Sequence, residues 1–273
     1  MDELQDRLVR LALGVLDEHG FALAGGYALQ AHGLVDRMSE DVDLFTDRWD
    51  GTEFGQAVDV VVGAYRQAGL DVTVVQQAGT FARLQVVDPD SKRAGSVDLA
   101  ADRRSRNPAR LSIGPVLAET DAVATKVATV FSRGEARDYL DLAGILASGR
   151  YSRDQLMGMA AEVDPGFAPR LFAEALAGVD RFPDEEFASY GVDTEHITAV
   201  RETMRSWSAA LVQELRRTSP GGDGPRTSPA ARALRVATSR AVRAPTQRRW
   251  SEPHPGPDSG YQPPTPEGPS VGL

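Results

Sequence analysis

The sequence predicts an α+β fold, in which a small mixed sheet is followed by a helical C-terminal domain. Helical and strand patterns alternate over the first part of the chain, and after Pro115 the pattern is entirely helical. The 273 residues, 41% of them hydrophobic, suffice for one large core or two modest ones. We therefore expect a sheet-containing core at residues 1–112, a helical domain at 113–218 and a disordered tail rich in Pro, Gly, Ser, Thr and Arg at 219–273.

The elements of the core follow from apolar spacing. Leu4, Leu8 and Leu11 recur at helical intervals and Gly20 ends the first helix, whereas short apolar runs or alternation indicate strands. In chain order, the expected core elements are a helix at 2–19, a strand at 21–24, a short helix at 27–32, a strand at 41–45, a helix at 53–68, and strands at 71–75, 81–87 and 96–100.

Turn residues divide the helical domain. Gly149, the Asp-Pro-Gly turn at 164–166 and the region of Pro183 separate helices, and Ser152 is a natural N-cap. The expected helices span residues 116–131, 136–148, 153–163, 168–179 and 194–217. A further short helix is expected inside the tail, from residue 228 to 243.

Composition excludes several classes of protein. The chain has no cysteine, which excludes disulfides, thiolate zinc sites and a cysteine nucleophile. No segment approaches the roughly 20 apolar residues of a membrane helix. The acidic N-terminus lacks the layout of a secretory signal. We expect a cytoplasmic protein without a membrane partner.

Charge and basic residues are unevenly distributed. Nine arginines and four acids lie between Arg216 and Leu273, which gives this segment a net charge of +5. Because the whole chain has a net charge of −9, residues 1–215 carry −14. Seven of these arginines, and no acid, fall between residues 226 and 250. This segment either contacts the phosphates of a nucleic acid, lies against the acidic body or is an inert extension. Only two of the 30 basic residues are lysines, Lys92 and Lys126. A lysine in so arginine-rich a chain suggests a specific role.

Two neighbouring motifs carry the chemistry. Gly25-Gly26 lies between a strand and a helix, where backbone amides can approach a phosphate. Asp41 and Asp43 alternate with apolar residues on the next strand, so both carboxylates point to one face. Adjacent carboxylates repel each other, and Mg²⁺ is a natural compensation. Each motif alone is weak, but their order predicts a site for a metal-bound triphosphate.

Asp98 is a third candidate ligand, a single acid in the apolar strand expected at 96–100. A buried acid inside a strand needs a partner. If this strand lies beside the one at 41–45, Asp98 completes a three-carboxylate site for two Mg²⁺ ions, one at the attacking hydroxyl and one at the triphosphate. The alternatives are a strand-end residue bonded to a turn and an ion pair with Arg103.

These motifs resemble the DNA polymerase β-like nucleotidyltransferase superfamily. Gly-Gly-Tyr-Ala-Leu at 25–29 and Arg-x-Ser-x-Asp-x-Asp-Leu-Phe at 37–45 are most similar to the AbiEii/AbiGii toxin family. Lys126 and the Arg-Asp-x-x-Asp-Leu segment at 137–142 extend the resemblance, which covers residues 20–145 and implies a polymerase β-like core. Gly26 stands where the wider superfamily has serine, so backbone amides must contact phosphate there alone.

The resemblance implies specific roles. The implied catalytic residues are Asp41, Asp43, Lys126 and Asp141; the implied nucleotide-binding residues are Gly25, Gly26, Arg37, Ser39 and Lys126; the implied metal ligands are Asp41, Asp43 and Asp98. Arg37 either neutralises phosphate or braces Asp43. Asp141 either orients Lys126, acts on the acceptor hydroxyl or pairs with Arg137 on its own helix. Lys126 is otherwise a surface lysine.

The resemblance implies a magnesium-dependent nucleotidyltransferase that moves a nucleoside monophosphate from an NTP to an acceptor hydroxyl and releases pyrophosphate. Family members are toxins of toxin–antitoxin and phage-abortive systems, and some modify the 3′ end of tRNA. The expected partners are an NTP, tRNA or another RNA acceptor, and a cognate antitoxin. Two alternatives remain: a small-molecule enzyme, for instance one modifying aminoglycosides, whose cationic substrate suits the acidic body, and a catalytically inactive module that binds a partner.

Overall fold

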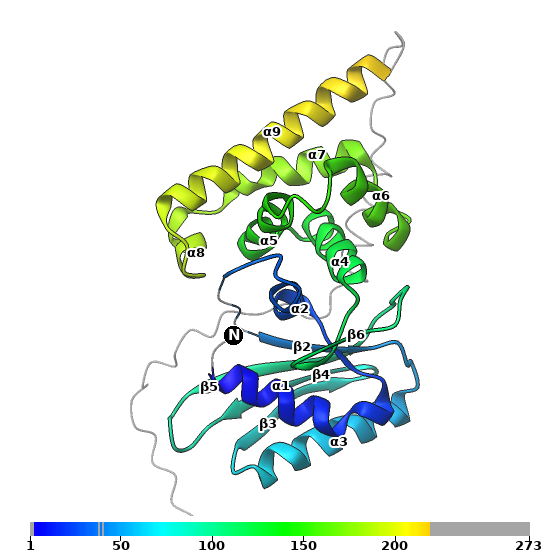
Figure 1. Cartoon of the computed structure of the whole chain (residues 1–273), viewed down its shortest axis with the longest axis vertical. Coiled ribbons are helices and arrows are strands. Elements are labelled where there is room, and N and C mark those ends of the chain that lie inside the picture. Colours follow the sequence, from blue (N-terminus) through cyan, green and yellow to red (C-terminus); the bar gives the residue numbers. More distant parts are fainter. Residues whose placement is uncertain (1–2, 38, 40, 219–273) are drawn as a thin grey trace, which may run out of the picture. The chain divides into compact units, whose positions relative to one another are not determined.

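A seven-stranded sheet and a group of helices make up the described part of the protein, as a computed structural model shows (Figure 1). The structure describes residues 3–37, 39 and 41–218. The tail expected at 219–273, with its short helix, lies outside the described residues. Within them, the order of elements confirms the predicted α+β fold with C-terminal helices.

The sheet is mixed and carries the candidate carboxylates near its middle. Its strands are β1 (Ala22–Leu23), β2 (Asp41–Thr46), β3 (Asp71–Ala78), β4 (Phe81–Val87), β5 (Ala94–Ala101), β6 (Ala109–Leu111) and β7 (Gly114–Val116). They are arranged in the order β3-β4-β5-β2-β1-β7-β6. β2 runs parallel to β5 and antiparallel to β1, and β4 is antiparallel to β5. The two strands that carry the acids, β2 and β5, are therefore adjacent, which is the condition that the sequence analysis set for Asp98 as a third ligand.

Three helices belong to the core: α1 (Glu3–Val15), α2 (Gly25–Ala31) and α3 (Gly51–Gln67). α1 and α3 lie side by side over one face of the sheet (Figure 1). The apolar stripe of α1, which includes Leu4 and Leu8, is buried there. A 3₁₀ turn, η1 (Asp17–His19), follows α1, and Gly20 ends it with φ 71°. α2 leads directly out of β1, and this places Gly25 and Gly26 at the centre of the sheet.

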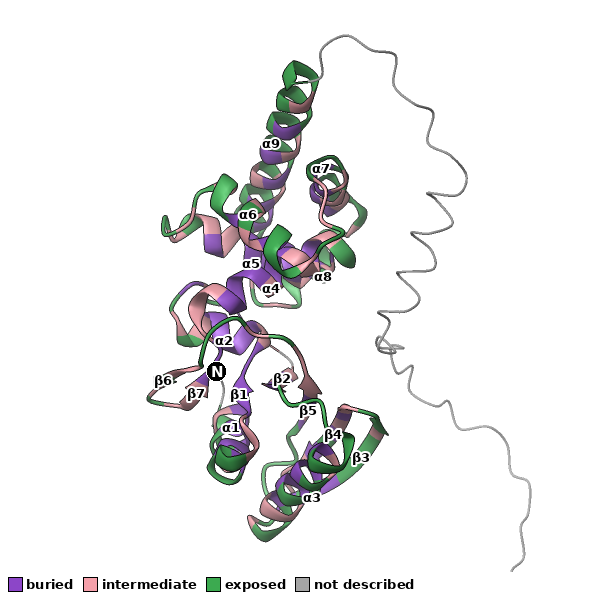
Figure 2. Cartoon of the chain, turned by 90° about the vertical axis from the view of Figure 1, so that its right-hand side faces the viewer, coloured by how far each residue is buried: buried purple, intermediate pink, exposed green. Residues whose placement is uncertain are grey.

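The helices that follow the sheet are α4 (Glu119–Ser132), α5 (Ala136–Ala147), α6 (Arg153–Val163), α7 (Pro169–Ala177), α8 (Asp184–Ala188) and α9 (Thr194–Thr218), with a 3₁₀ turn, η2 (Gly178–Arg181), after α7. Ser152 caps α6, as expected, in a capping box with Gln155. Buried and exposed residues alternate along α9 (Figure 2), whose buried stripe includes Met204 and Trp207. None of the described helices is both long and apolar enough to cross a membrane.

The structure departs from the expected elements mainly between residues 109 and 119. A helix from residue 116 is wrong: β6 and β7 form a hairpin, and Val116 pairs with Leu23 of β1. Three-residue strands are too short for periodicity to reveal, and Pro115 is also typical of a helix start. The expected domain division at residue 112 falls inside this hairpin, so the division remains a prediction. The five-residue α8 was not expected either.

Candidate active site

The glycine pair and the carboxylates of β2 meet at the end of β1. The Ala24 amide donates a hydrogen bond to the Asp43 carbonyl oxygen at 2.8 Å, so Gly25 begins α2 directly beside β2. Gly25 has φ +59°, and a Cβ atom there would lie 1.9 Å from Asp43 Oδ2. Only glycine can bring the backbone this close to the carboxylate.

The segment before β2 folds against the same glycines. A Cβ atom on Gly26 would lie 3.0 Å from Ser39 Oγ and 3.1 Å from an Arg37 guanidinium nitrogen. The Tyr27 hydroxyl donates a hydrogen bond to the Ser39 carbonyl at 2.7 Å, which ties α2 to this segment. The structure therefore brings together Gly25, Gly26, Arg37, Ser39 and Asp43, all of which the sequence analysis selected.

Arginines compensate two of the three strand carboxylates. Arg137 on α5 lies 3.3 Å from Asp41 Oδ2, and both side chains are 15% exposed. On β4, Arg83 donates to both oxygens of Asp98, with Nε–Oδ1 at 2.7 Å and a terminal nitrogen–Oδ2 distance of 2.5 Å. The pKa of Asp43, in contrast, is raised to about 6, by burial first and then by the negative charges of Asp98 and Asp41.

Lys126 lies on α4 in a buried cluster of charges. Its Nζ atom is 2.8 Å from Asp141 Oδ2 and 3.0 Å from Asp138 Oδ1, both on α5. Arg37 approaches Asp141 from the core in a bidentate pair, at 2.6 and 2.7 Å. Burial lowers the pKa of Lys126, but the charges of Asp141 and Asp138 outweigh it, so its pKa lies above the ordinary value. The ammonium therefore stays charged.

Asp138 anchors this cluster within the helical part. Its oxygens also lie 3.1 and 3.2 Å from Arg133, and one accepts a hydrogen bond from the Glu135 amide at the start of α5. Burial raises its pKa, yet Lys126 and Arg133 lower it far more, so the pKa lies well below the usual range. Asp138 is thus ionised and fixed, and it holds Lys126 in place.

Two of these pairings were not anticipated from the sequence: Asp98 pairs with Arg83 instead of Arg103, and Asp141 pairs with Arg37. The contact between Asp141 and Lys126 agrees with one of the three alternatives for Asp141, that it orients the lysine, whereas the pair with Arg137 is not formed. A sequence signal exists for Asp138, whereas Arg83 meets Asp98 through a strand register that only the structure shows. Asp138 and Asp141 are three residues apart and share a helix face. The β4–β5 register places Phe81 opposite Ala100, and so Arg83 opposite Asp98.

A divalent cation fits the position between Asp41 and Asp43. Their carboxylates share one face of β2, and the pKa of Asp43 is raised by burial first and then by the negative charges of Asp98 and Asp41, which a bound cation would offset. Mg²⁺ in triphosphate enzymes is commonly held by one or two carboxylates together with the phosphates of the substrate. Among the described residues, no three acidic or histidine side chains converge on one metal position. The assignment of all site residues, including Asp98 as a ligand, remains a prediction.

The raised pKa of Asp43 predicts a pH-dependent gain in stability for Asp43→Asn. Because the folded-state pKa is near 6 and the unfolded value near 4, ionised Asp43 destabilises the metal-free protein above pH 6, and the penalty disappears as pH falls towards 4. In EDTA at pH 8 we expect the variant to be more stable by about 3 kcal/mol, with the difference vanishing near pH 4. Urea unfolding at both pH values measures it. A variant less stable than wild type at pH 8 would contradict the strain assigned to this carboxylate.

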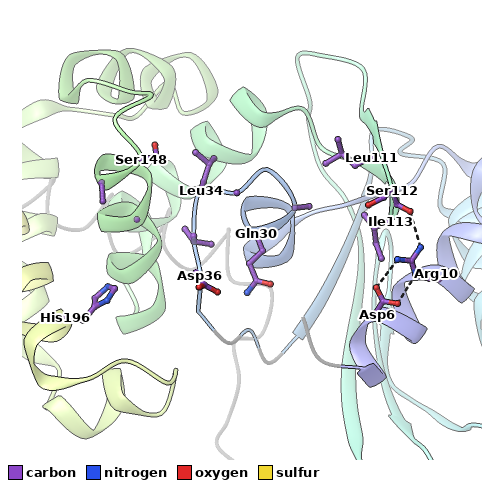
Figure 3. Close-up of a pocket in the computed structure, with 15 residues that line it drawn as sticks. Asp6, Arg10, Gln30, Leu34, Asp36, Leu111, Ser112, Ile113, Ser148 and His196 are labelled. Carbon is purple, nitrogen blue, oxygen red and sulfur yellow. Dashed lines mark hydrogen bonds and ion pairs between the residues drawn. The ribbon is translucent and has the colours of Figure 1, made fainter.

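A separate pocket of about 720 Å³ opens beside the site (Figure 3). The parts of the chain that line it include α1, α5, the β6–β7 hairpin and the loop that follows α2. The side chains of Gln30 and Asp36 face the pocket. Arg10, paired with Asp6 and bonded to the Ser112 carbonyl, stands at its edge. The lining includes none of the candidate catalytic or nucleotide-binding residues.

Comparison with known proteins shows the family of the chain. Residues 7–189 match the family model described as nucleotidyl transferase AbiEii toxin, type IV TA system. The nucleotidyltransferase toxin MenT4 from Mycobacterium tuberculosis H37Rv is similar over 88% of this chain and 93% of its own, at 20% identity and a TM-score of 0.53. The structure of JHP933 from Helicobacter pylori is similar over 80% of this chain and 97% of its own chain, at 17% identity and a TM-score of 0.44. No curated protein matches the sequence.

The fold and the family match together define an enzyme of the nucleotidyltransferase class. More narrowly, the chain belongs to the AbiEii nucleotidyl transferase toxin family, whose match extends from α1 to the end of α8. This confirms the resemblance found in the sequence and makes the chain a nucleotidyltransferase of toxin–antitoxin type.

Proposed function

We propose that the enzyme transfers a nucleoside monophosphate from a magnesium-bound NTP to a hydroxyl group of tRNA. One observation carries this proposal: Gly25 lies against Asp43, and Gly26 lies beside Arg37, which shares the carboxylate of Asp141 with Lys126. The positive charges of Arg137 and Lys126 act on Asp43 and partly offset the rise of its pKa, which supports placing both cations near this carboxylate.

Each residue has a distinct task in this proposal. Asp41 and Asp43 hold Mg²⁺, which when bound neutralises triphosphate charge and stabilises the in-line transition state. The backbone of Gly25-Gly26 and the Ser39 hydroxyl contact phosphate oxygens.

Lys126 supplies a positive charge to the triphosphate. Asp138 and Asp141 occupy two of its three N–H directions, which leaves the third for a phosphate oxygen. Asp141 is a positioning residue, since its carboxylate aligns Lys126 with Arg37. In the reaction the acceptor oxygen bonds to the α-phosphorus, the bond to the bridging oxygen breaks, pyrophosphate leaves and the hydroxyl proton passes to solvent.

The acceptor decides between two versions of the proposal. An RNA acceptor is supported by the family resemblance and by the arginine-rich segment at 226–250. The excess of 14 negative charges over residues 1–215 favours a cationic small molecule such as an aminoglycoside instead. We propose tRNA as the acceptor, a cognate antitoxin as partner and growth inhibition through abortive infection as the outcome in the cytoplasm.

The test incubates the full-length chain and Mg²⁺ with each of the four α-³²P-labelled NTPs, and with either bulk tRNA or a panel of aminoglycosides. We expect label on tRNA, abolished by EDTA, and none on the aminoglycosides. Heat-treated tRNA whose 3′ end has been oxidised with periodate is the matched control and should remain unlabelled. Label on an aminoglycoside alone would replace the tRNA version with the small-molecule one.

A further inference from the structure

A row of charged side chains crosses three strands beside the metal position. β4 and β5 pair so that Arg83 lies opposite Asp98, and β5 and β2 pair so that Asp98 lies opposite Asp43. Residues in register on paired strands point to the same face of a sheet. Arg83, Asp98 and Asp43 therefore form a continuous row, with Asp41 two positions along β2.

Arg83 engages the whole carboxylate of Asp98. Its Nε and terminal nitrogens contact Oδ1 and Oδ2 separately, at 2.7 and 2.5 Å. Planar, bidentate pairs of this kind are the strongest that a carboxylate forms with a side chain. The pair is largely buried, with the side chains 23% and 10% exposed, and the guanidinium group also lies 5.8 Å from the centre of the Phe81 ring. Both the position and the orientation of Asp98 are fixed by β4.

This pairing competes with metal coordination by Asp98. A second divalent cation bound by Asp98 and Asp43 would have to take an oxygen from Arg83 and lie close to the guanidinium charge. At the low effective dielectric of a partly buried site, that repulsion is large. Among the described residues, no third acid joins Asp41 and Asp43 around one metal position, which agrees with Asp98 being turned to Arg83.

We propose that Arg83 sets the metal stoichiometry of the site: Asp41 and Asp43 bind one divalent cation, and Asp98 is reserved for Arg83. The inference rests on the proposed function, because it concerns the metal that the reaction uses. Arg83 is a positioning residue here. Its fixed positive charge occupies the side of the row on which a second cation would otherwise stand.

The experiment counts bound Mn²⁺ without any substrate. Free Mn²⁺ is titrated into the full-length protein and measured by electron paramagnetic resonance, whose signal is lost on binding. We expect wild type to bind one Mn²⁺ ion and Arg83→Met to bind two, because methionine is unbranched like the arginine stem but carries no charge. The double variant Arg83→Met/Asp98→Asn should again bind one. Arg103→Met, which removes an exposed arginine that follows the end of β5, is the matched control and should keep one site.

Asp98→Asn alone keeps the test decisive if Arg83→Met does not fold. We expect this variant to bind one Mn²⁺ like wild type, because Asp98 is not a ligand. Two sites in wild type, with one lost in Asp98→Asn, would overturn the proposal and favour the two-metal site that the sequence suggested. No site in wild type, or a site that survives Asp41→Asn, would instead overturn the metal assignment of the proposed function.

Discussion

Asp41→Asn should abolish nucleotidyl transfer and leave the protein folded. The amide cannot supply the charge that holds Mg²⁺ against the triphosphate, and loss of several kcal/mol of transition-state stabilisation lowers the rate by about 100-fold or more. The side chain of Asp41 is 15% exposed and its pair with Arg137 is long, at 3.3 Å, so the fold should tolerate the change. Incorporation of label from α-³²P-NTP into acceptor, at matched protein concentration, measures the loss.

The matched control for this variant is Asp47→Asn. Asp47 follows β2 directly and pairs with Arg104 at 2.5 Å, so the control also removes one acid–arginine pair, but at the other end of the strand. It should retain full transfer. Wild-type activity in Asp41→Asn, or equal losses in the two variants, would show that Asp41 is not a metal ligand.

Lys126→Met should remove both nucleotide binding and a large part of the stability of the helical region. The change leaves Asp138 and Asp141 buried without their shared cation, and breaking a buried pair in this way costs about 3–5 kcal/mol. Lys126→Arg keeps the charge but introduces a larger, planar group into the space between two fixed carboxylates. We therefore expect Lys126→Arg to fold more stably than Lys126→Met and still to show a strongly raised KM for NTP.

Separating the two effects requires thermal unfolding and kinetics on the same samples. Lys92→Met is the matched control, since it replaces the only other lysine, an exposed residue in the β4–β5 turn, and should change neither quantity. Full activity of Lys126→Arg would show that the site needs only a positive charge. A normal KM in a folded Lys126→Met would show that the lysine does not contact the triphosphate.

Local sequence patterns were sufficient to predict how the glycine pair and the carboxylates of β2 lie. Alternation of apolar residues with Asp41 and Asp43 placed both carboxylates on one face, and β2 has this pattern of burial. The glycine pair was expected to bring backbone close to the site, and Gly25 lies against Asp43. These features depend on residues a few positions apart, where the period of a strand or the needs of a turn decide the geometry.

The pairing of charges could not be predicted in the same way. Arg37 and Asp141 are 104 residues apart, and their contact depends on how α5 packs against the core. Nothing local distinguishes Arg83 from other arginines of this arginine-rich chain until the register of β4 and β5 is known. The β6–β7 hairpin was missed for a related reason, because its three-residue strands are recognised only through their pairing within the sheet.

The most direct test of the central claim places the label at different phosphates of the same NTP. With tRNA, Mg²⁺ and the full-length enzyme, α-³²P-NTP should label the acceptor, γ-³²P-NTP should leave it unlabelled, and labelled pyrophosphate should appear in proportion to the product. Asp41→Asn should give none of these products. Transfer of the γ-label to the acceptor, or release of labelled orthophosphate in place of pyrophosphate, would contradict nucleotidyl transfer at this site.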